Sequence, residues 1–357
     1  MSATANHSTE TPALPRYDWH ETYEWNFDHA PEPVRAEEPP IPGDWDYCGL
    51  SVASPLGIAA GPLLNGKWIL YYASLGFDVL TYKTVRSRAR ASYPLPNLQP
   101  VAADAVRGGD KPLPADSEMR GSWAVSFGMP SKSPDFWRHD VEETRRNLPK
   151  GKVLSISVVA TPEAHWTLDE VAEDFARCAR WAVESGADCI EANFSCPNVA
   201  SADGQLYQQP AAAGLVAARA REAIGSVPLL IKVGHVRDSG LATALAEAVA
   251  PHANALVMVN CVSATVVDSG QRAMFDGQKR GIAGAAIREA ALDQICLFSR
   301  VRRERRLTLQ LVGVGGISSA ADVRQHLEAG SHAVQLATTA MLDPQAGLKI
   351  RATLSAT

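Results

Sequence analysis

The chain of 357 residues contains no Cys-x-x-Cys pair, no long apolar run and no excess of basic residues. Its six cysteines are scattered, which argues against an iron–sulfur cluster, a zinc site or a dense disulfide framework and makes a reducing cytoplasm the expected location. No apolar stretch is long enough to cross a bilayer, and residues 1–10 lack the basic-then-apolar layout of a secretory signal. The net charge of −5 gives no support to nucleic-acid binding, which requires a basic footprint.

The composition that is present, 46% hydrophobic and 20% charged residues, is typical of a soluble globular protein with a sizeable core. We expect residues 1–45 to form an N-terminal extension and residues 46–357 to form one domain. The first dozen residues are expected to be disordered. The aromatic part of the extension is expected to cover the main body, because Trp19, Trp25 and Trp45 would be unfavourable in a free tail. A membrane anchor is the alternative, but the segment lacks a Lys/Arg-rich face.

From residue 50 onward, short apolar runs alternate with helical patterns. The predicted strands are 56–60, 78–83, 153–158, 188–193, 229–233, 255–260, 309–314 and 333–337. The predicted helices include 168–185, 211–224, 241–250, 285–303 and 320–329. This alternation predicts an α/β fold, a (β/α)₈ barrel of the TIM type. A doubly wound sheet is the competing interpretation.

One long interruption, residues 84–150, separates the second predicted strand from the third. It carries a Gly-containing turn, Ser-Phe-Gly-Met-Pro at 126–130, and a predicted helix near 134–148. Connections of this length in a compact domain are usually functional. We therefore predict a lid over the catalytic face of the barrel.

The segment Ala-Asn-Phe-Ser-Cys-Pro-Asn at 192–198 follows a buried strand. Its asparagines suit a ligand with alternating C=O and N–H groups, and Cys196 can act as a base or nucleophile where its surroundings favour the thiolate. The alternative interpretation is a strand end and turn with an inert cysteine.

The site of such a barrel is built at the carboxyl ends of the strands. At the first strand, Ala59, Ala60 and Gly61 are small enough for a flat ring to approach the backbone. Four other strands end in polar side chains, which are costly to bury unless they are paired or functional: Lys83 with Thr84, Asn193, Lys232 and Asn260. A lysine reaching to solvent explains either lysine alone equally well, but the set together with Cys196 favours a functional site.

The last two predicted strands run into Gly-Val-Gly-Gly at 313–316 and into Ala337 and Thr338. Glycine-rich backbone before a helix binds anions, and the loops after strands seven and eight are the usual phosphate site of these barrels. Residues 281–284 are expected to open the helix predicted at 285–303, before the seventh strand, and they predict a second patch of backbone donors.

One set of motifs occurs in the order of a known family, at 57–61, 83–84, 126–130, 193–198, 232, 260, 281–284, 313–316 and 335–338. With these motifs, the chain resembles the dihydroorotate dehydrogenase family, and through it the pyrimidine-forming domain of dihydropyrimidine dehydrogenases. The resemblance covers residues 49 to 350. It implies a cytoplasmic, homodimeric flavoprotein of pyrimidine biosynthesis: an FMN-dependent oxidoreductase acting on CH–CH bonds. The implied substrate is dihydroorotate, oxidised to orotate, or a related dihydropyrimidine or cyclic amide.

The resemblance also implies residue roles. Cys196 is the expected base, as in the soluble class of the family, and Lys83 the second catalytic residue. FMN is expected on Ala59, Ala60, Gly61, Lys83, Thr84, Asn193, Lys232, Val259, Gly284, Gly315, Gly316, Ala337 and Thr338, with its phosphate on the last four. The substrate is expected on Lys83, Phe127, Gly128, Met129, Asn193, Asn198, Asn260 and Cys261.

Four positions depart from the family pattern: Val125 and Cys261 replace the usual Asn and Ser, Ser131 stands where Asn is common, and Asn97 ends an element that lacks its Arg. Three of these changes remove polar or positive groups, so the flavin contacts look kept and the substrate contacts altered. The alternatives are a flavin-free barrel enzyme acting on a phosphorylated metabolite through Lys83 or Lys232, and a non-catalytic binding barrel. The chain carries no nicotinamide motif, and the extension does not resemble the helical pair of a quinone tunnel.

Overall fold

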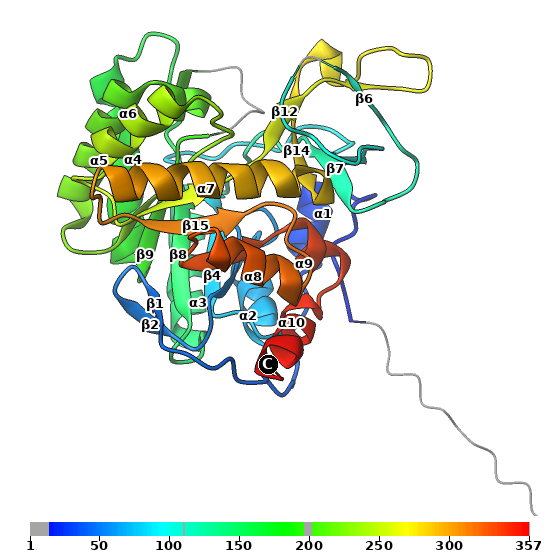
Figure 1. Ribbon diagram of the computed structural model, residues 1–357, viewed down its shortest axis with the longest axis horizontal. Coiled ribbons are helices and arrows are strands. Elements are labelled where there is room, and N and C mark those ends of the chain that lie inside the picture. The colour runs from blue at the N-terminus through cyan, green and yellow to red at the C-terminus, as the bar shows by residue number, and fades with distance from the viewer. Residues whose placement is uncertain (1–13, 110, 196–201, 357) are drawn as a thin grey trace, which may run out of the picture.

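The computed structural model describes residues 14–109, 111–195 and 202–356. Eight parallel strands form a closed barrel at its centre (Figure 1). They are β3 (Leu56–Ile58), β4 (Val79–Val85), β8 (Val153–Val158), β9 (Cys189–Asn193), β10 (Leu229–Lys232), β11 (Ala255–Met258), β15 (Gln310–Val314) and β16 (Ala333–Leu336). Each strand pairs with the next one along the barrel, and β16 pairs with β3 to close it. The predicted barrel is confirmed, and the doubly wound sheet was wrong.

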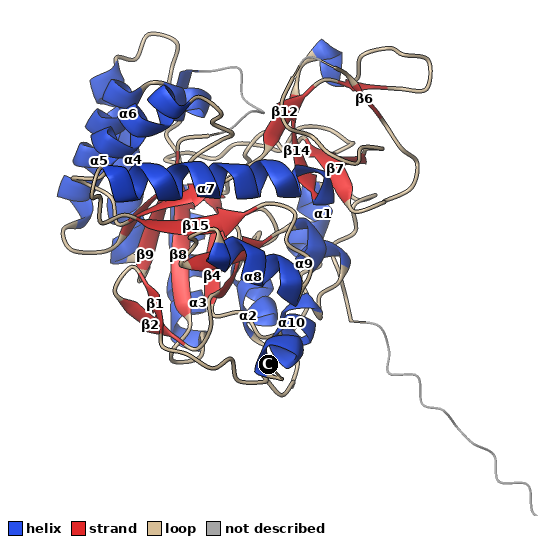
Figure 2. Cartoon of the chain, in the orientation of Figure 1, coloured by secondary structure: helices blue, strands red, loops and turns tan. Residues whose placement is uncertain are grey.

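Helices surround the barrel on its outer face (Figure 2). They are α2 (Gly66–Ala73), α4 (Leu168–Glu184), α5 (Pro210–Ile224), α6 (Ser239–Val249), α7 (Arg288–Glu304), α8 (Ala320–Glu328), the short α9 (Thr338–Leu342) and α10 (Ala346–Ser355), with a 3-10 turn, η1 (Ala202–Gln208), before α5. Local sequence explains the helix starts; for example, Thr167 and Glu170 form a capping box at the start of α4.

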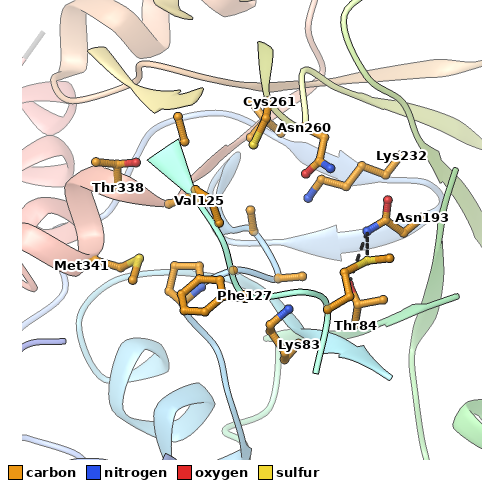
Figure 3. Close-up of a pocket in the computed structure, with 18 of the residues that line it drawn as sticks. Lys83, Thr84, Val125, Phe127, Asn193, Lys232, Asn260, Cys261, Thr338 and Met341 are labelled. Carbon is orange, nitrogen blue, oxygen red and sulfur yellow. Dashed lines mark hydrogen bonds between the residues drawn. The ribbon is translucent and has the colours of Figure 1, made fainter. Parts of the chain in front are cut away.

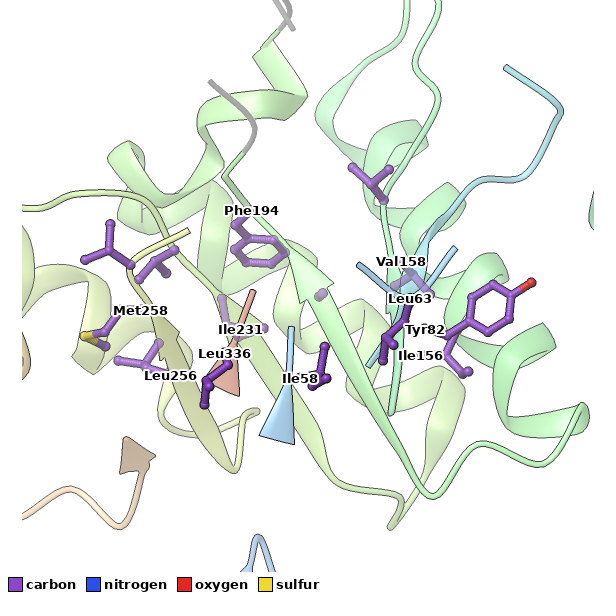
Figure 4. Close-up of a cluster of buried hydrophobic side chains, with 14 of the residues drawn as sticks. Ile58, Leu63, Tyr82, Ile156, Val158, Phe194, Ile231, Leu256, Met258 and Leu336 are labelled. Carbon is purple, nitrogen blue, oxygen red and sulfur yellow. The ribbon is translucent and has the colours of Figure 1, made fainter. Parts of the chain in front are cut away.

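Side chains alternate between the two faces of each barrel strand, as the strand repeat requires. The outward-facing residues form the main core beneath the helices, including Ile58, Tyr82, Ile156, Ile231 and Leu336 (Figure 4). The inward-facing residues include Val79, Val153, Cys189, Leu230 and Val312, which pack on Tyr47. Tyr47 comes from a hairpin of β1 (Trp45–Tyr47) and β2 (Leu50–Val52). This hairpin therefore closes the amino-terminal end of the barrel, leaving its carboxyl end for a ligand.

Residues 84–150, predicted to form a lid, contribute strands to sheets that are built from two separate segments. The first segment supplies β5 (Leu98–Pro100), β6 (Leu113–Pro114), β7 (Ser122–Val125) and α3 (Pro134–Asn147). The second, which follows β11, supplies β12 (Val262–Ala264), β13 (Val266–Val267) and β14 (Arg280–Gly284). The antiparallel sheet has the order β12-β14-β7-β5, and β13 pairs with β6. These strands lie at the upper right of Figure 1, at one edge of the barrel.

Residues 281–284 do not open a helix, and that prediction was wrong. They belong to β14, and Gly281 pairs with Val125 on one side and Ser263 on the other. Sheet pairing therefore takes up much of the backbone hydrogen-bonding capacity that was assigned to anion binding. The next helix begins only at Arg288, after a 3-10 turn, η3 (Ala285–Ile287).

The aromatic part of the N-terminal extension packs against the main body, as expected. Helix α1 (Tyr23–Asp28) starts at the capping side chain of Thr22, and the buried aromatic residues are Tyr17, Tyr23 and Phe27. Trp25 is 38% exposed, so tyrosine and phenylalanine rather than this tryptophan make the contact. The first dozen residues lie outside the described residues. Within the described part of the chain, no helix is both long and apolar enough to cross a membrane.

Candidate active site

Strand alternation turns three functional side chains into the mouth of the barrel. In β4, Val79 points inward, so Lys83 also points inward four residues later. By the same count, Cys189 places Asn193 inward in β9, and Leu230 places Lys232 inward in β10. Lys83, Asn193 and Lys232 are each less than 10% exposed. In β4 the alternation ends at this point, because the pairing with β8 shifts register between Tyr82 and Val85 and the adjacent Thr84 also lines the cavity.

These side chains line a cavity at the carboxyl end of the barrel. Thr338 and Met341 lie on the side opposite Asn193 and Lys232 (Figure 3). The predicted site residues on its wall are Ala59, Ala60, Gly61, Lys83, Thr84, Phe127, Met129, Asn193, Lys232, Asn260, Cys261, Ala337 and Thr338. Sequence reasoning missed Pro62, Leu98, Trp123 and Met341, which also line it. Ala283 and Val314 line it too, and they lie within the predicted anion-binding stretches 281–284 and 313–316.

Asn193 occupies the centre of a small polar network (Figure 3). Its Nδ2 lies 3.4 Å from Thr84 Oγ1 and 3.7 Å from Met129 Sδ, and its Oδ1 accepts a hydrogen bond from the Ser195 backbone N–H at 3.1 Å. Asn260 donates to the Ser195 carbonyl. These contacts fix the chain at the end of β9, directly before Cys196.

Lys232 forms a buried ion pair inside the barrel. Its Nζ lies 3.5 Å from Glu191 Oε1, and the two side chains are 4% and 0% exposed. The Glu191 oxygens make no hydrogen bond within the described residues. Because an isolated buried carboxylate is strongly unfavourable, Lys232 compensates the charge of Glu191 while its ammonium group lines the cavity.

A second, smaller pocket adjoins the first, and Gly315, Gly316, Ala337 and Thr338, which follow β15 and β16, lie on its wall. Gly315 and Gly316 have φ values of +126° and +71°, which favour glycine. A Cβ on Gly316 would lie 2.5 Å from Arg288 Cβ. Arg288 holds this loop, because its Nε donates to the Gly316 carbonyl at 3.0 Å and lies 3.2 Å from Asp322 Oδ1.

His326 of α8 packs against the end of β15, directly before this loop. Its imidazole is fully buried against Gly313. Burial lowers the pKa of His326 to about 4, because the charged form loses its hydration. The side chain is therefore neutral at physiological pH and adds no charge to the pocket.

The two pockets share Asn260, Ala283, Val314, Ala337 and Thr338, so they form one continuous site. Of the other predicted residues, Gly284 lines the second pocket, whereas Gly128 and Val259 line neither. Gly128 instead packs under the ring of Tyr93. Cys196 and Asn198 lie outside the described residues. No group of His, Cys, Asp and Glu side chains suited to a metal ion occurs within the described ranges.

Comparison with known proteins shows the family of this chain. Residues 44–357 match the family model described as dihydroorotate dehydrogenase. The chain belongs to the dihydroorotate dehydrogenase family. It is 29% identical to a dihydroorotate dehydrogenase of Dictyostelium discoideum over 94% of this chain and 96% of the relative. It is 32% identical to the catalytic subunit of dihydroorotate dehydrogenase B (NAD(+)) of Geotalea daltonii over 86% of this chain and 90% of the relative.

A solved structure supports the fold. The crystal structure of DHODH from Eimeria tenella in complex with ferulenol superposes with a TM-score of 0.73 at 16% identity, covering 93% of this chain and 88% of the other. Family membership makes the protein an FMN-dependent oxidoreductase that acts on CH–CH bonds.

Proposed function

We propose that the protein oxidises dihydroorotate to orotate, with FMN held across the two adjoining pockets and Cys196 as the base. The observation that carries this proposal is the continuity of the cavity, which holds two lysines and two asparagines, with the glycine-lined pocket after β15 and β16. When bound, FMN supplies the two-electron acceptor for the hydride.

The residues present fit FMN. A Cβ built on Gly61 meets nothing within 4 Å, so the backbone after β3 is open to a flat ring. Gly315 and Gly316 pack so closely on η3 and α7 that a side chain would collide there, and they line the pocket after β15, where backbone N–H groups before a helix suit a phosphate. The charge of Lys232, fixed by Glu191 at 3.5 Å, would stabilise the reduced, anionic flavin.

The substrate would lie between the flavin ring and the lid. The side-chain amides of Asn193 and Asn260 supply both donors and acceptors for the ring edges of a cyclic amide, and Lys83 supplies a positive charge. Cys196 would remove the proton from the substrate carbon next to the carbonyl while the hydride leaves the adjacent carbon. Its position directly after Ser195, which Asn193 and Asn260 hold, supports this role.

The departures from the family pattern favour a related dihydropyrimidine or cyclic amide as a second candidate substrate. Val125 and Cys261 both line the cavity, so these two changes lie where a substrate would bind. Ser131 and Asn97 do not line it. Ser131 Oγ accepts from the Arg86 backbone N–H at 3.1 Å, and Asn97 bonds to backbone groups of the lid.

Anaerobic addition of dihydroorotate to the purified protein tests the proposal. Flavin absorbance that bleaches rapidly is the expected result. Flavin that stays oxidised would contradict dihydroorotate as substrate and favour the second candidate. A protein that takes up no FMN would contradict the whole proposal.

Cys196→Ser tests the assignment of the base, with Cys261→Ser as the matched control because Cys261 also places a thiol in the cavity. We expect the first variant to slow the bleaching at least about a hundredfold at neutral pH and the second to keep it. The reverse result would move the base to Cys261. The expected homodimer stays a prediction, which the molar mass in solution would test.

A further inference from the structure

Residues 17–23 of the N-terminal extension lie directly behind one wall of the cavity. Phe127 lines the cavity, and two tyrosines contact its ring edge-on. The ring centroids of Tyr17 and Phe127 are 6.3 Å apart at 75°, and those of Tyr23 and Phe127 are 5.9 Å apart at 68°. Both tyrosines are 3% exposed. They precede residues 44–357, the region that the family model matches.

Asn97 connects the same extension to the lid through its side chain. It is 1% exposed, and its Oδ1 accepts a hydrogen bond from the Tyr23 backbone N–H at 3.0 Å. Its Nδ2 donates to the Tyr93 carbonyl at 2.8 Å and to the Ser126 carbonyl at 3.3 Å. One buried amide therefore ties together the extension, the loop at 93–97 and the turn that carries Phe127.

The backbone of that turn depends on the same neighbours. The Ser126 N–H donates to the Asn97 carbonyl at 2.7 Å, and the Tyr93 N–H donates to the Phe127 carbonyl at 3.0 Å. At Gly128 (φ +74°), a Cβ would lie 2.7 Å from the ring of Tyr93. The next residue of the turn is Met129, whose Sδ lies 3.7 Å from Asn193 Nδ2. A displacement of the turn would therefore reach Asn193 as well as Phe127.

We propose that Tyr17, Tyr23 and Asn97 are positioning residues for the substrate, which hold Phe127 and Met129 against the cavity without touching the substrate themselves. The inference rests on the proposed function, because it assumes that the substrate lies against this wall. It makes the N-terminal extension a part of the active site. The glycine-lined pocket is built by β14 to β16, η3 and the start of α9, so the part of FMN that lies in this pocket is held independently of the contact with Phe127.

The variant Tyr23→Leu tests the inference, because it removes the ring behind Phe127 and keeps the backbone N–H that donates to Asn97 Oδ1. The matched control is Trp25→Leu on the same helix, where the indole is 38% exposed and stacks on His29. We expect Tyr23→Leu to raise the Kd of orotate, read from the flavin absorbance, and the KM of dihydroorotate about tenfold. The Kd of FMN should stay unchanged, and Tyr23→Phe should restore the wild-type values.

Deuterium exchange provides a second measurement that needs no substrate. Tyr23→Leu and Asn97→Leu should each raise uptake at 123–131 while 313–319 stays unchanged. Unchanged uptake at 123–131, or an orotate Kd that rises no more than in Trp25→Leu, would overturn the inference. A rise in the FMN Kd as large as that for orotate would also overturn it, since the variant would then act by general destabilisation. A wild-type protein that binds FMN but neither dihydroorotate nor orotate would instead contradict the proposed substrate, and the exchange result would still decide the inference.

Discussion

The two sides of the active site are built in different ways. The cofactor side consists of strand ends and the loops that directly follow them, and its groups are backbone glycines and the Lys232–Glu191 pair. The substrate wall consists of side chains from the turn at 126–129, from β7 and from the segment after β11, with the N-terminal extension packed behind it. The wall therefore depends on chain segments outside the barrel strands and the loops that directly follow them.

This difference assigns different roles to the two sides. Substitutions on the cofactor side meet rigid backbone or a buried charge, so they should change stability and FMN binding strongly. A substitution at the wall changes one side chain that faces the ligand. It should therefore change only substrate binding, and by less than a substitution on the cofactor side changes stability or FMN binding. The four predictions below begin with the largest expected effect and end with the smallest, and each can contradict this division.

Replacement of the buried lysine should have the largest effect. In Lys232→Met, Glu191 stays fully buried without its ion-pair partner, and the free energy of unfolding of the FMN-free protein should fall by about 3–5 kcal/mol. Chemical denaturation measures this change. The double variant Lys232→Met/Glu191→Gln removes the buried charge and should recover much of the loss. Equal stability of the single and double variants would show that the pair does not contribute to folding.

A methyl group in the phosphate loop should weaken FMN binding. In Gly316→Ala, the new Cβ would lie 2.5 Å from Arg288 Cβ, and such overpacking costs about 1–3 kcal/mol, or about 5- to 150-fold in Kd. Gly277→Ala is the matched control, because Gly277 has a similar φ of +75° with nothing within 4 Å of its Cβ. Fluorescence titration with FMN measures both. A comparable loss in the control would point to backbone strain alone.

Acidification should act on the cofactor side through His326. Because burial lowers the pKa of His326 to about 4, the unfolded chain binds a proton near pH 6.5 while the folded chain does not. The stability contributed by the neutral imidazole is present above pH 6.5 and is lost as the pH falls towards 4, by about 3 kcal/mol in total. Denaturation of wild type and His326→Gln at several pH values isolates this contribution. Parallel pH profiles of the two proteins would contradict it.

A polar group in the substrate wall should have the smallest effect. Val125→Asn places an amide in the cavity, and one hydrogen bond to a cyclic amide contributes about 0.5–1.5 kcal/mol. We expect the KM of dihydroorotate to fall two- to tenfold, with no change in the Kd of FMN. Val125→Leu, which keeps the wall apolar, should not lower the KM. If the Kd of FMN changes as much as the KM, the two sides of the site are not independent.

Much of the cofactor side could be predicted from the sequence. The eight barrel strands were recognisable as apolar runs, and the inward direction of Lys83, Asn193 and Lys232 follows from strand alternation. Gly315 and Gly316 were recognisable because they come directly after an apolar run and before a helix. All of these signals are local.

The wall could be predicted only in part. Phe127 and Met129 were named from a motif, but the strands β12 and β14 were missed because β14 pairs with β7, far away in the chain. Residues 281–284 looked like a helix start because their glycines fit either context. The pairing with β7 decided between the two, and no local pattern shows such pairing.

The sequence by itself determined the barrel, the polar residues at its strand ends and the glycine loops, because the periodicity of side chains and the conformational freedom of glycine are properties of neighbouring residues. Only the tertiary structure decided that Glu191 lies beneath Lys232, that two distant segments form one sheet over the cavity, and that Tyr17, Tyr23 and Asn97 hold Phe127 in place. These contacts join residues far apart in the chain, so their formation depends on the packing of the whole molecule.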